Sequence, residues 1–390
     1  MLAFLVFRLG LFIVSLIPCT RIRGAVELPW PPAPKKFRIN MSNRFLRLLD
    51  EKPTLLIDGA TGTNLFELGL QSGDSPEFWN IDHPDRVAKH YRSFIDAGSD
   101  IVLTNTFGGT SYRLKLHQAQ DRVHEFNKAA AEILVAEIKD SGRDVAVAGS
   151  MGPTGEILQP AGEVSIEQAQ AAFTEQAMAL AEGGADLLWI ETISSVEEAH
   201  AAVRGASKAG LPIVLTLSID TNGRTMMGVT PSDLVNLQAE LPVPLMAYGT
   251  NCGLGAAEVV AAIINMTQAA DKIGAEPILV AKGNCGIPEW VDGDICYSGT
   301  PELMARYVQL VIDAGARIVG GCCGTTPEHV AAMRVAMDNH VRGDKPSLET
   351  LQKELGEVTA GAQAQMTGDL SVEGGATSKG HRSGSRNRRR

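Results

Sequence analysis

Cysteine is scarce in this chain, which contains six cysteines among 390 residues. Six cysteines are too few for the dense set of disulfides that stabilises small secreted proteins. The paired C-x-x-C spacing of many structural zinc centres does not occur at all. The sequence therefore excludes a disulfide framework, and the reduced thiols that this implies favour a location in the cytoplasm.

An excess of positive charge is also missing, because the formal net charge is −10. This balance argues against a general nucleic-acid binder, although residues 380–390 form a basic tail that we interpret as disordered. Nucleotide-binding loops are missing too, since the Gly-rich stretch DGATGT at residues 58–63 matches neither G-x-G-x-x-G nor the P-loop with its lysine. Nucleic acid is therefore not among the predicted partners.

An apolar stretch opens the chain at residues 1–18 and is interrupted by Arg8. It lacks a small-x-small cleavage site, is marginal in length for a bilayer span, and has positive charges after it instead of before it. Regular sequence begins only after Met41. We therefore interpret residues 1–40 as upstream sequence translated from a wrong start, take Met41 as the true start, and predict no membrane partner.

The sequence does contain an ordinary globular composition, with 44% hydrophobic and 21% charged residues. From residue 54 onward, short aliphatic or β-branched runs alternate with amphipathic segments, which predicts a parallel sheet covered by helices. One such segment carries Val87, Tyr91, Phe94 and Ile95 at helical spacing. The predicted strands are residues 54–58, 100–104, 144–150, 186–191, 212–218, 244–250, 277–282 and 317–321.

Eight strands of this kind predict an α/β fold, a closed (β/α)8 TIM barrel. We assign the barrel to residues 41–340. Residues 341–390 are expected to be a flexible C-terminal tail that includes a candidate helix at residues 347–358.

Unusual residues gather where the predicted strands end. Asp58 ends the first strand, Glu191 ends the fourth, Cys252 follows the sixth, and Cys322 and Cys323 follow the eighth. In a TIM barrel these ends share the C-terminal face, on which active sites are built. We therefore expect three thiols and two carboxylates on one rim.

The three thiols allow two interpretations. A set of three protein ligands leaves one position on zinc open for water or substrate, which is typical of a catalytic centre. Adjacent residues cannot point the same way in a regular strand, but a loop flanked by glycine lets both sulfurs face one metal. Alternatively, the cysteines are small buried apolar residues. Spacing alone leaves both interpretations open.

Longer motifs at these strand ends resemble the homocysteine S-methyltransferase family over about residues 45–340. They are DGATGT at 58–63, NTF at 105–107, GAD and IET within 184–192, NCG at 251–253 and GGCCGTTPEH at 320–329. The last motif is also similar to the homocysteine-binding module of cobalamin-dependent methionine synthase. GRTMMG at 223–228 and KGNCGIP at 282–288 resemble bacterial betaine-homocysteine methyltransferases. The resemblance implies a TIM-barrel transferase that converts homocysteine to methionine.

The resemblance also implies roles for the residues on the rim. The three thiols become zinc ligands, and Glu191 and Asp58 hold the amino group of homocysteine. The backbone amides of Gly59, Ala60 and Thr61 receive its carboxylate. Carboxylates at strand ends also often cap the following helix, so a purely structural role stays open for Asp58 and Glu191.

The remaining cysteines have no implied ligand role. Cys285 and Cys296 are interpreted as bystanders, although Cys285 lies at the same rim, and Cys19 falls in the leader. Asn284, beside Cys285, is implied by the resemblance as the group that fills the open zinc position when homocysteine is absent.

Zinc suits this chemistry because only a thiolate attacks well, whereas a free thiol, with a pKa of about 8.5, is mostly protonated at neutral pH. Three cysteine thiolates give the zinc centre a net charge of about −1, so a fourth sulfur stays electron-rich. Such a sulfur would attack a methyl group in line and displace a neutral leaving group from a cationic donor. Positioning and desolvation would be the main contributions of the protein.

The favoured methyl donor is glycine betaine, and sulfonium compounds are the other small-molecule candidates. A quaternary ammonium group favours an aromatic cage. The aromatic candidates near rim loops are Phe78, Trp79, Phe107, Tyr112 and Tyr297. The alternative is a homocysteine-activating subunit that takes its methyl group from a separate corrinoid protein, because this sequence contains no cobalamin-binding module.

Two hypotheses lie outside this enzyme class. A non-catalytic barrel would bind zinc and homocysteine without turnover. An exported protein with disulfide-bonded cysteines would lose its free thiols, although vicinal cysteines are poor disulfide partners. The sequence predicts no oligomeric state.

Overall fold

The computed structural model describes residues 43–286, 288–291 and 294–369. The leader over residues 1–40, the proposed start at Met41, Cys19 and the basic tail at 380–390 lie outside the described residues. The proposed boundary at residue 41 therefore stays a prediction.

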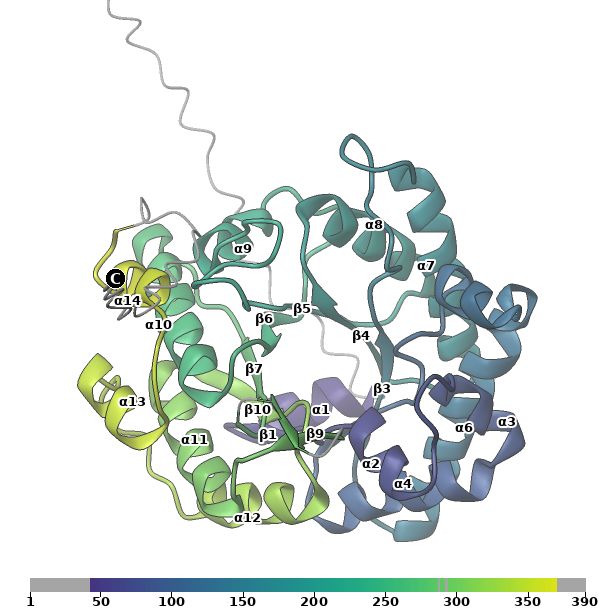
Figure 1. Cartoon of the computed structure of the whole chain (residues 1–390), viewed down its shortest axis with the longest axis horizontal. Helices are drawn as coiled ribbons and strands as arrows, with labels where there is room; N and C mark the ends of the chain where they lie inside the picture. Colours follow the sequence, from purple (N-terminus) through teal and green to yellow (C-terminus); the bar gives the residue numbers. More distant parts are fainter. Residues whose placement is uncertain (1–42, 287, 292–293, 370–390) are drawn as a thin grey trace, which may run out of the picture. The chain divides into compact units, whose positions relative to one another are not determined.

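Eight parallel strands form the centre of the described chain (Figure 1). They are hydrogen-bonded in the order β1-β10-β7-β6-β5-β4-β3-β2. An isolated bridge between Ile57, the residue after the first strand of this order, and Ile101 of the last strand closes the ring. The strands are β1 Leu55–Leu56, β2 Ile101–Leu103, β3 Ala146–Met151, β4 Leu187–Ile193, β5 Ile213–Leu217, β6 Ala247–Cys252, β7 Leu279–Gly283 and β10 Ala316–Gly321. The predicted TIM barrel is confirmed, and each predicted strand is present.

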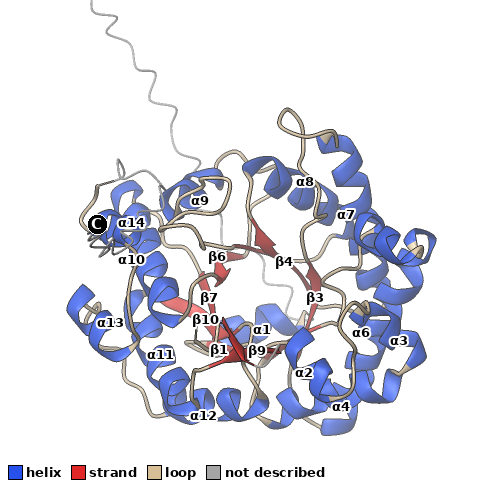
Figure 2. Ribbon diagram, in the orientation of Figure 1, coloured by secondary structure: helices blue, strands red, loops and turns tan. Residues whose placement is uncertain are grey.

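Helices surround this ring of strands (Figure 2). The α-helices are α1 Arg44–Glu51, α2 Gly62–Glu67, α3 Trp79–Asp82, α4 Pro84–Asp96, α5 Ser111–Leu114, α6 Val123–Ser141, α7 Ile166–Glu182, α8 Val196–Ala206, α9 Pro231–Leu237, α10 Ala256–Ile273, α11 Pro301–Ala314, α12 Pro327–Asp338, α13 Leu348–Glu354 and α14 Ala360–Met366. Short 3-10 turns are η1 Pro76–Phe78, η2 Lys115–His117, η3 Gln120–Arg122 and η4 Ser207–Ala209.

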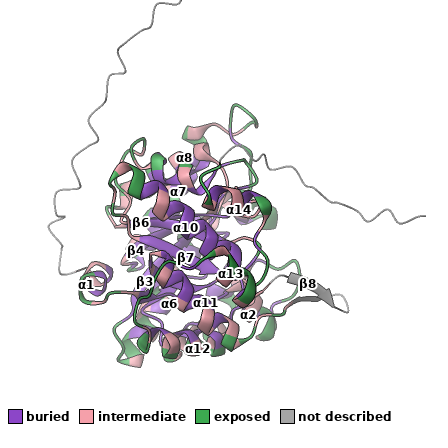
Figure 3. Cartoon of the chain, turned by 90° about the vertical axis from the view of Figure 1, so that its left-hand side faces the viewer, coloured by how far each residue is buried: buried purple, intermediate pink, exposed green. Residues whose placement is uncertain are grey.

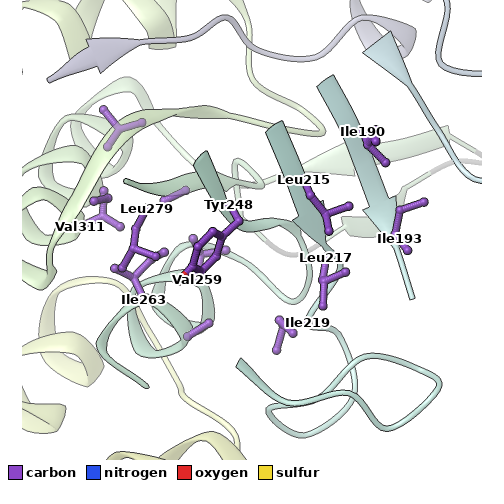
Figure 4. Packing of buried hydrophobic residues seen from close by; sticks show 14 of the residues in the cluster. Ile190, Ile193, Leu215, Leu217, Ile219, Tyr248, Val259, Ile263, Leu279 and Val311 are labelled. Atoms are coloured by element: carbon purple, nitrogen blue, oxygen red, sulfur yellow. The ribbon is translucent and has the colours of Figure 1, made fainter. Parts of the chain in front are cut away.

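Helix α4 shows how the sequence covers the barrel. Pro84 stands at the first helical position, where the N–H that proline lacks has no partner within the helix. The predicted stripe of Val87, Tyr91, Phe94 and Ile95 is fully buried. It joins the cluster that fills the space between helices and strands. Another part of this cluster packs strands against α10 and α11 (Figure 4).

The barrel interior forms a second hydrophobic cluster. Trp189 of β4 fills it, beside the small side chains of Ala146 and Ala148 on the neighbouring β3. Helix α1 contributes Phe45 and Leu48 to the same cluster. The buried residues concentrate in the strands and on the inner faces of the helices (Figure 3). Because α1 covers the end where the strands begin, an open site must lie at the opposite end.

Two parts of the structure differ from the expectation. A hairpin, β8 Pro288–Val291 with β9 Asp294–Tyr297, lies between β7 and α11 and was not predicted. The segment expected to be a flexible tail contains α13, which matches the candidate helix, and α14, which does not match any prediction. Their buried residues include Leu351 and Ala362, so residues 348–366 form part of the packed structure. No helix among the described residues is both long and apolar enough to cross a membrane.

Candidate metal and substrate site

The three predicted thiols converge at the C-terminal end of the barrel. Cys252 is the last residue of β6, and Cys322 and Cys323 directly follow β10. Their sulfur atoms all lie within 4.8 Å of one another, and no other group of metal ligands of this kind occurs in the described chain. The Sγ of Cys252 is 2.9 Å from that of Cys322 and 3.8 Å from that of Cys323.

Glycines allow the two loops to turn so sharply. Cys252 itself has a φ of +59° and Gly253 a φ of +72°, a left-handed conformation that favours glycine. A side chain at Gly253 would lie 2.6 Å from the carbonyl oxygen of Ile219. On the other loop, a side chain at Gly321 would lie 2.2 Å from Thr325. Close packing therefore fixes both turns, and the adjacent cysteines point to one side as the loop interpretation requires.

Two asparagines anchor the loops that carry the cysteines through hydrogen bonds. The Oδ1 of Asn251 accepts hydrogen bonds from the Thr216 hydroxyl at 2.7 Å and the Thr192 N–H at 2.9 Å. The Nδ2 of Asn284 donates to the Gly253 carbonyl at 2.8 Å, and its Oδ1 accepts from the Cys323 N–H at 3.1 Å. Asn284, the implied fourth ligand, therefore ties together the two loops that carry the thiols.

The sulfur positions fit a tetrahedral metal with thiolate ligands. Zinc–sulfur bonds of about 2.3 Å place tetrahedral sulfurs about 3.8 Å apart. The Cys252–Cys323 pair already has that separation, 3.8 Å, while the Cys252–Cys322 pair at 2.9 Å would open on binding. The cysteines are half-buried and line a cavity, so they are not simply core residues.

The thiols strongly influence one another's protonation. Hydrogen bonds to Cys322 and Cys323, together with burial, raise the pKa of Cys252 well above that of a free thiol. Hydrogen bonds from Cys252 and Cys322 lower the pKa of Cys323. The cluster thus favours one thiolate that is stabilised by two protonated thiols, and three thiolates need a cation to balance them.

A buried lysine joins the two predicted carboxylates. Asp58, Glu191 and Lys282 are 1%, 7% and 2% exposed. The Nζ of Lys282 lies 3.4 Å from Asp58 Oδ1 and 3.9 Å from Glu191 Oε2. Burial lowers the pKa of Lys282, but the two carboxylates outweigh this effect and raise it overall, so the lysine stays protonated. With both carboxylates ionised, the trio carries one negative charge in excess.

Neither carboxylate caps a helix. Asp58 Oδ2 accepts from the Leu103 N–H at 2.7 Å, and Glu191 Oε1 accepts from the Ser150 hydroxyl at 2.6 Å. Burial, only partly offset by Lys282, raises the pKa of Glu191 to about 7 and also raises that of Asp58. These contacts place both side chains on the rim beside the thiols.

Sequence reasoning missed Lys282, although a signal was present. The residue is the last but one of β7, and its Cα pairs with Asn251 on one side and Gly320 on the other. A charged residue at the end of an apolar strand stands on the same rim as the other candidates. Its partners, however, come from β4 and from the loop after β1.

A cavity of about 450 Å³ opens above these groups. Its lining includes the three thiols, Glu191 and Lys282, together with the predicted backbone at Gly59, Ala60 and Thr61. The Ala60 N–H already donates to the Thr325 carbonyl at 3.0 Å. Of these three amides, those of Gly59 and Thr61 are therefore the better candidates for an incoming carboxylate.

The aromatic candidates divide into two groups. Phe107 lines the cavity, and so does Phe66, which was not predicted. Phe78 stacks on Phe126 at 4.9 Å between ring centroids, and Trp79 is buried beneath Arg86. The remaining two, Tyr112 and Tyr297, are not among the lining residues of the cavity. The five candidates do not assemble into a cage within the described chain.

Cys285 is the remaining cysteine whose side chain the structure describes, and it lies outside the three-thiol cluster. Cys285 is fully buried, and its Sγ donates to the Gly299 carbonyl at 3.2 Å. It is not a member of the three-thiol group. The side chain of Cys296 lies outside the described residues.

Comparison with known proteins yields one family. The family model described as "Homocysteine S-methyltransferase" matches residues 55–337, which include the whole barrel and every rim residue discussed above. The methionine synthase of Mycobacterium tuberculosis is 29% identical over 316 residues, which are 75% of this chain and 26% of that protein. The methionine synthase of Mycobacterium leprae is 29% identical over 72% of this chain and 24% of its own length. The chain thus spans about a quarter of the length of these relatives.

Solved structures agree on the fold. The homocysteine methyltransferase MmuM from Escherichia coli, in its metallated form, superposes with a TM-score of 0.62 at 24% identity. Its oxidised form gives a TM-score of 0.63 at 25% identity. Each match covers 75% of this chain and 99% of the MmuM chain.

Proposed function

The chain belongs to the homocysteine S-methyltransferase family, and from this premise we propose that it methylates the thiol of homocysteine to give methionine in a zinc-dependent reaction. One observation carries the proposal. Three sulfurs within 4.8 Å of one another share a cavity with Glu191 and Lys282, and Lys282 also pairs with the buried carboxylate of Asp58, which does not itself line the cavity. The first group suits a soft metal, and the second suits the ammonium group of an amino acid.

Cys252, Cys322 and Cys323 would hold the zinc, for which the E. coli relative in its metallated form is indirect support. When bound, zinc would supply a positive centre that keeps the substrate sulfur in its thiolate form at neutral pH. Asn251 and Asn284 keep the two cysteine loops in place through the hydrogen bonds described above.

The trio of Asp58, Glu191 and Lys282 would bind the amino group of homocysteine. With both carboxylates ionised, the single excess negative charge is neutralised by one ammonium group, so substrate binding leaves a balanced buried cluster. The amides of Gly59 and Thr61, which line the same cavity, would receive the carboxylate. These contacts hold the amino-acid end, and the thiol end then points to the sulfur cluster.

The transfer itself is a displacement on carbon. On binding, the homocysteine thiol releases its proton to solvent. A new S–CH3 bond then forms, and the bond between the donor atom and that methyl breaks, leaving its electron pair on the donor atom. A cationic donor thus leaves as a neutral amine or thioether. Phe66, Phe107 and Leu116 contribute apolar side chains to the cavity lining, against which a methyl donor would pack.

Glycine betaine is the donor that we favour, and sulfonium compounds are the second choice. Phe66 and Phe107 offer aromatic faces to a methylated cation. Glu77, which also lines the cavity and is 4% exposed, adds a carboxylate near them. Its Oε1 accepts from the Gly108 N–H at 2.6 Å, which fixes its orientation. An onium group would therefore meet both aromatic and negative surface.

The decisive experiment measures methionine formation from homocysteine by the zinc-loaded full chain under reducing conditions. Glycine betaine, S-methylmethionine and dimethylsulfoniopropionate are supplied in parallel reactions. Turnover with betaine supports the full proposal, and turnover with a sulfonium alone corrects the donor. If the protein binds zinc and homocysteine but turns over none of the three donors, only the proposed metal and homocysteine site is supported.

A second candidate is a homocysteine-activating subunit that receives methyl groups from a corrinoid protein. Large apolar side chains are exposed at the cavity mouth, namely Phe66 at 50%, Phe107 at 39% and Leu116 at 69%. Such a rim suits contact with another protein. The relatives named methionine synthase are also about four times as long as the matched segment. Methionine formation only when a methylated corrinoid protein is added would favour this candidate.

A further inference from the structure

We propose that α14 is a clamp that positions the metal-binding turn at Cys252, and that it acts through the loop between β5 and α9. Helix α14 spans Ala360–Met366 and lies beyond residues 55–337, which match the family. The proposal rests on the metal site proposed above and adds a positioning element to it. Three sets of contacts connect the helix to Cys252.

The first contacts join α14 to a tight turn at residues 221–224. Asn222 and Gly223 have φ values of +51° and +78° at the centre of this turn. The Gly361 N–H donates to Asn222 Oδ1 at 2.7 Å, and Gln365 Nε2 donates to the Gly223 carbonyl at 2.8 Å. A side chain at Gly361 would lie 2.0 Å from the Asn222 carbonyl oxygen. The helix therefore sits on the turn at a separation that only glycine permits.

The second contact is a buried carboxylate that joins three segments. Glu258 lies in the first turn of α10 and is 3% exposed. It accepts from the Thr359 hydroxyl at 2.6 Å and from the Thr359 N–H at 3.0 Å, which fixes the N-cap of α14. It also accepts a backbone hydrogen bond from Gly223. Glu258 thus ties the start of α10, the start of α14 and the 221–224 turn together.

The third contact reaches the cysteine. Ile219, just before the turn, abuts Gly253 so closely that a side chain on Gly253 would lie 2.6 Å from the Ile219 carbonyl oxygen. Cys252 and Gly253 form the left-handed backbone that aims the Cys252 sulfur at its partners. Helix α10, which holds Glu258, begins three residues later at Ala256. The Cys252 turn is therefore confined between two segments that α14 fastens.

The loop does not anchor itself through its largest apolar side chains. Met226 and Met227 at its tip are 71% and 49% exposed. The Thr225 hydroxyl holds the far side of the loop to the Ser194 carbonyl at 2.6 Å. The 221–224 side is held by Gln365 and Glu258, both at most 5% exposed. Buried hydrogen bonds of this kind fix the position of the loop, whereas an apolar contact would hold the loop without fixing its position.

The test compares Gly361→Ala and Gln365→Ala with Thr367→Ala, each in the full chain. Thr367 is exposed, and its hydroxyl bonds only within α14, to the Ala364 carbonyl. Three readouts are used: amide hydrogen exchange at residues 219–225 and 252–255 in the metal-free protein, zinc release to an excess of chelator, and the thiolate-to-metal absorption of the Co²⁺-loaded protein. Fold integrity is checked by the melting temperature.

The two clamp variants should lose exchange protection at both segments, shift the Co²⁺ absorption, and release zinc about tenfold faster, as is typical when a supporting residue of a metal site is removed. Thr367→Ala should match the wild type. Faster exchange at 219–225 alone, with residues 252–255 and zinc release unchanged, would overturn the proposal.

Gln365→Ala removes the hydrogen bonds to the Gly223 carbonyl and from Asn265 without introducing a clash, so it remains informative if Gly361→Ala unfolds. None of the readouts requires turnover, so an inactive wild type would count against the proposed function and not against the clamp. If the wild type held no zinc, hydrogen exchange at residues 252–255 would still decide whether α14 positions the Cys252 turn.

Discussion

Two buried aspartates at opposite ends of the barrel are held very differently. Asp100, before β2 at the covered end, is 1% exposed and is bonded by Lys52 at 2.5 Å, by Arg334 at 3.1 Å and by the Leu56 N–H at 2.8 Å. Asp58, at the open end, is also 1% exposed but shares the single cation of Lys282 with Glu191. Asp100 is fully paired, whereas Asp58 and Glu191, when both are ionised, are left one positive charge short. That deficit is what a substrate ammonium would fill.

The largest effect should come from the thiols. Cys322→Ala should lose zinc and at least about a thousandfold in activity, because two thiolates hold the metal poorly. Metal content and methionine formation are measured together. Cys285→Ala is the matched control, because that buried thiol lies outside the cluster and should keep both. Retained activity in a zinc-free Cys322→Ala protein would break the proposed mechanism.

The next effect tests the comparison directly. Lys282→Met leaves two buried carboxylates without their cation, so we expect a loss of about a hundredfold in kcat/KM and a lower melting temperature. Lys52→Met removes a cation from Asp100, which keeps Arg334, so it should lower stability by about 1 kcal/mol and leave the kinetics alone. A change in homocysteine affinity in Lys52→Met would show that the covered end of the barrel influences the substrate site at the open end.

A smaller effect is expected from a substitution of one carboxylate at the open end of the barrel. Glu191→Gln keeps the shape of the side chain but removes the charge that would pair with the substrate. Homocysteine should bind about 10–100-fold more weakly, the range expected for losing one charged hydrogen bond. Zinc should stay bound, which metal analysis of the same sample checks. Unchanged homocysteine affinity would remove Glu191 from the site.

The last prediction concerns the dependence of stability on pH, away from the proposed site. His90 of α4 is 2% exposed, and burial lowers its pKa to about 4 from an ordinary value of 6.5. Because the unfolded chain binds this proton more readily, stability is full above pH 6.5 and falls as the pH drops toward 4. About 2 kcal/mol should be lost between pH 7 and pH 5 through this residue. Denaturant unfolding of His90→Gln should show a correspondingly flatter dependence over that range.

The sequence predicts the barrel well because its signals are local. Each strand is a short apolar run, and each rim candidate directly follows or ends such a run, so Asp58, Glu191 and the three cysteines could be assigned to one face. Lys282 was missed because its importance depends on which carboxylates lie opposite it, and those belong to strands far away in the sequence. Hydrophobic periodicity does not distinguish a lysine that faces such partners from one that faces water.

Helix α14 was missed for a related reason. Its sequence, AGAQAQM, has little apolar periodicity, and its docking relies on polar contacts with residues far along the chain. Gly361 is hydrogen-bonded to Asn222, which lies 139 positions earlier in the sequence. Gln365 is hydrogen-bonded to Gly223, which lies 142 positions earlier. A pattern that is read along the chain predicts elements, but it does not predict such pairings.

The spacing of the cysteines has a consequence for the lifetime of the protein. Cys252 and Cys322 are 70 positions apart, with β7 between their strands in the sheet. An ion held by both would act as a cross-link that closes this long loop and restricts the unfolded chain. Cells starved of that metal would then lose the enzyme as well as its activity, because the unloaded chain opens more often and is degraded sooner.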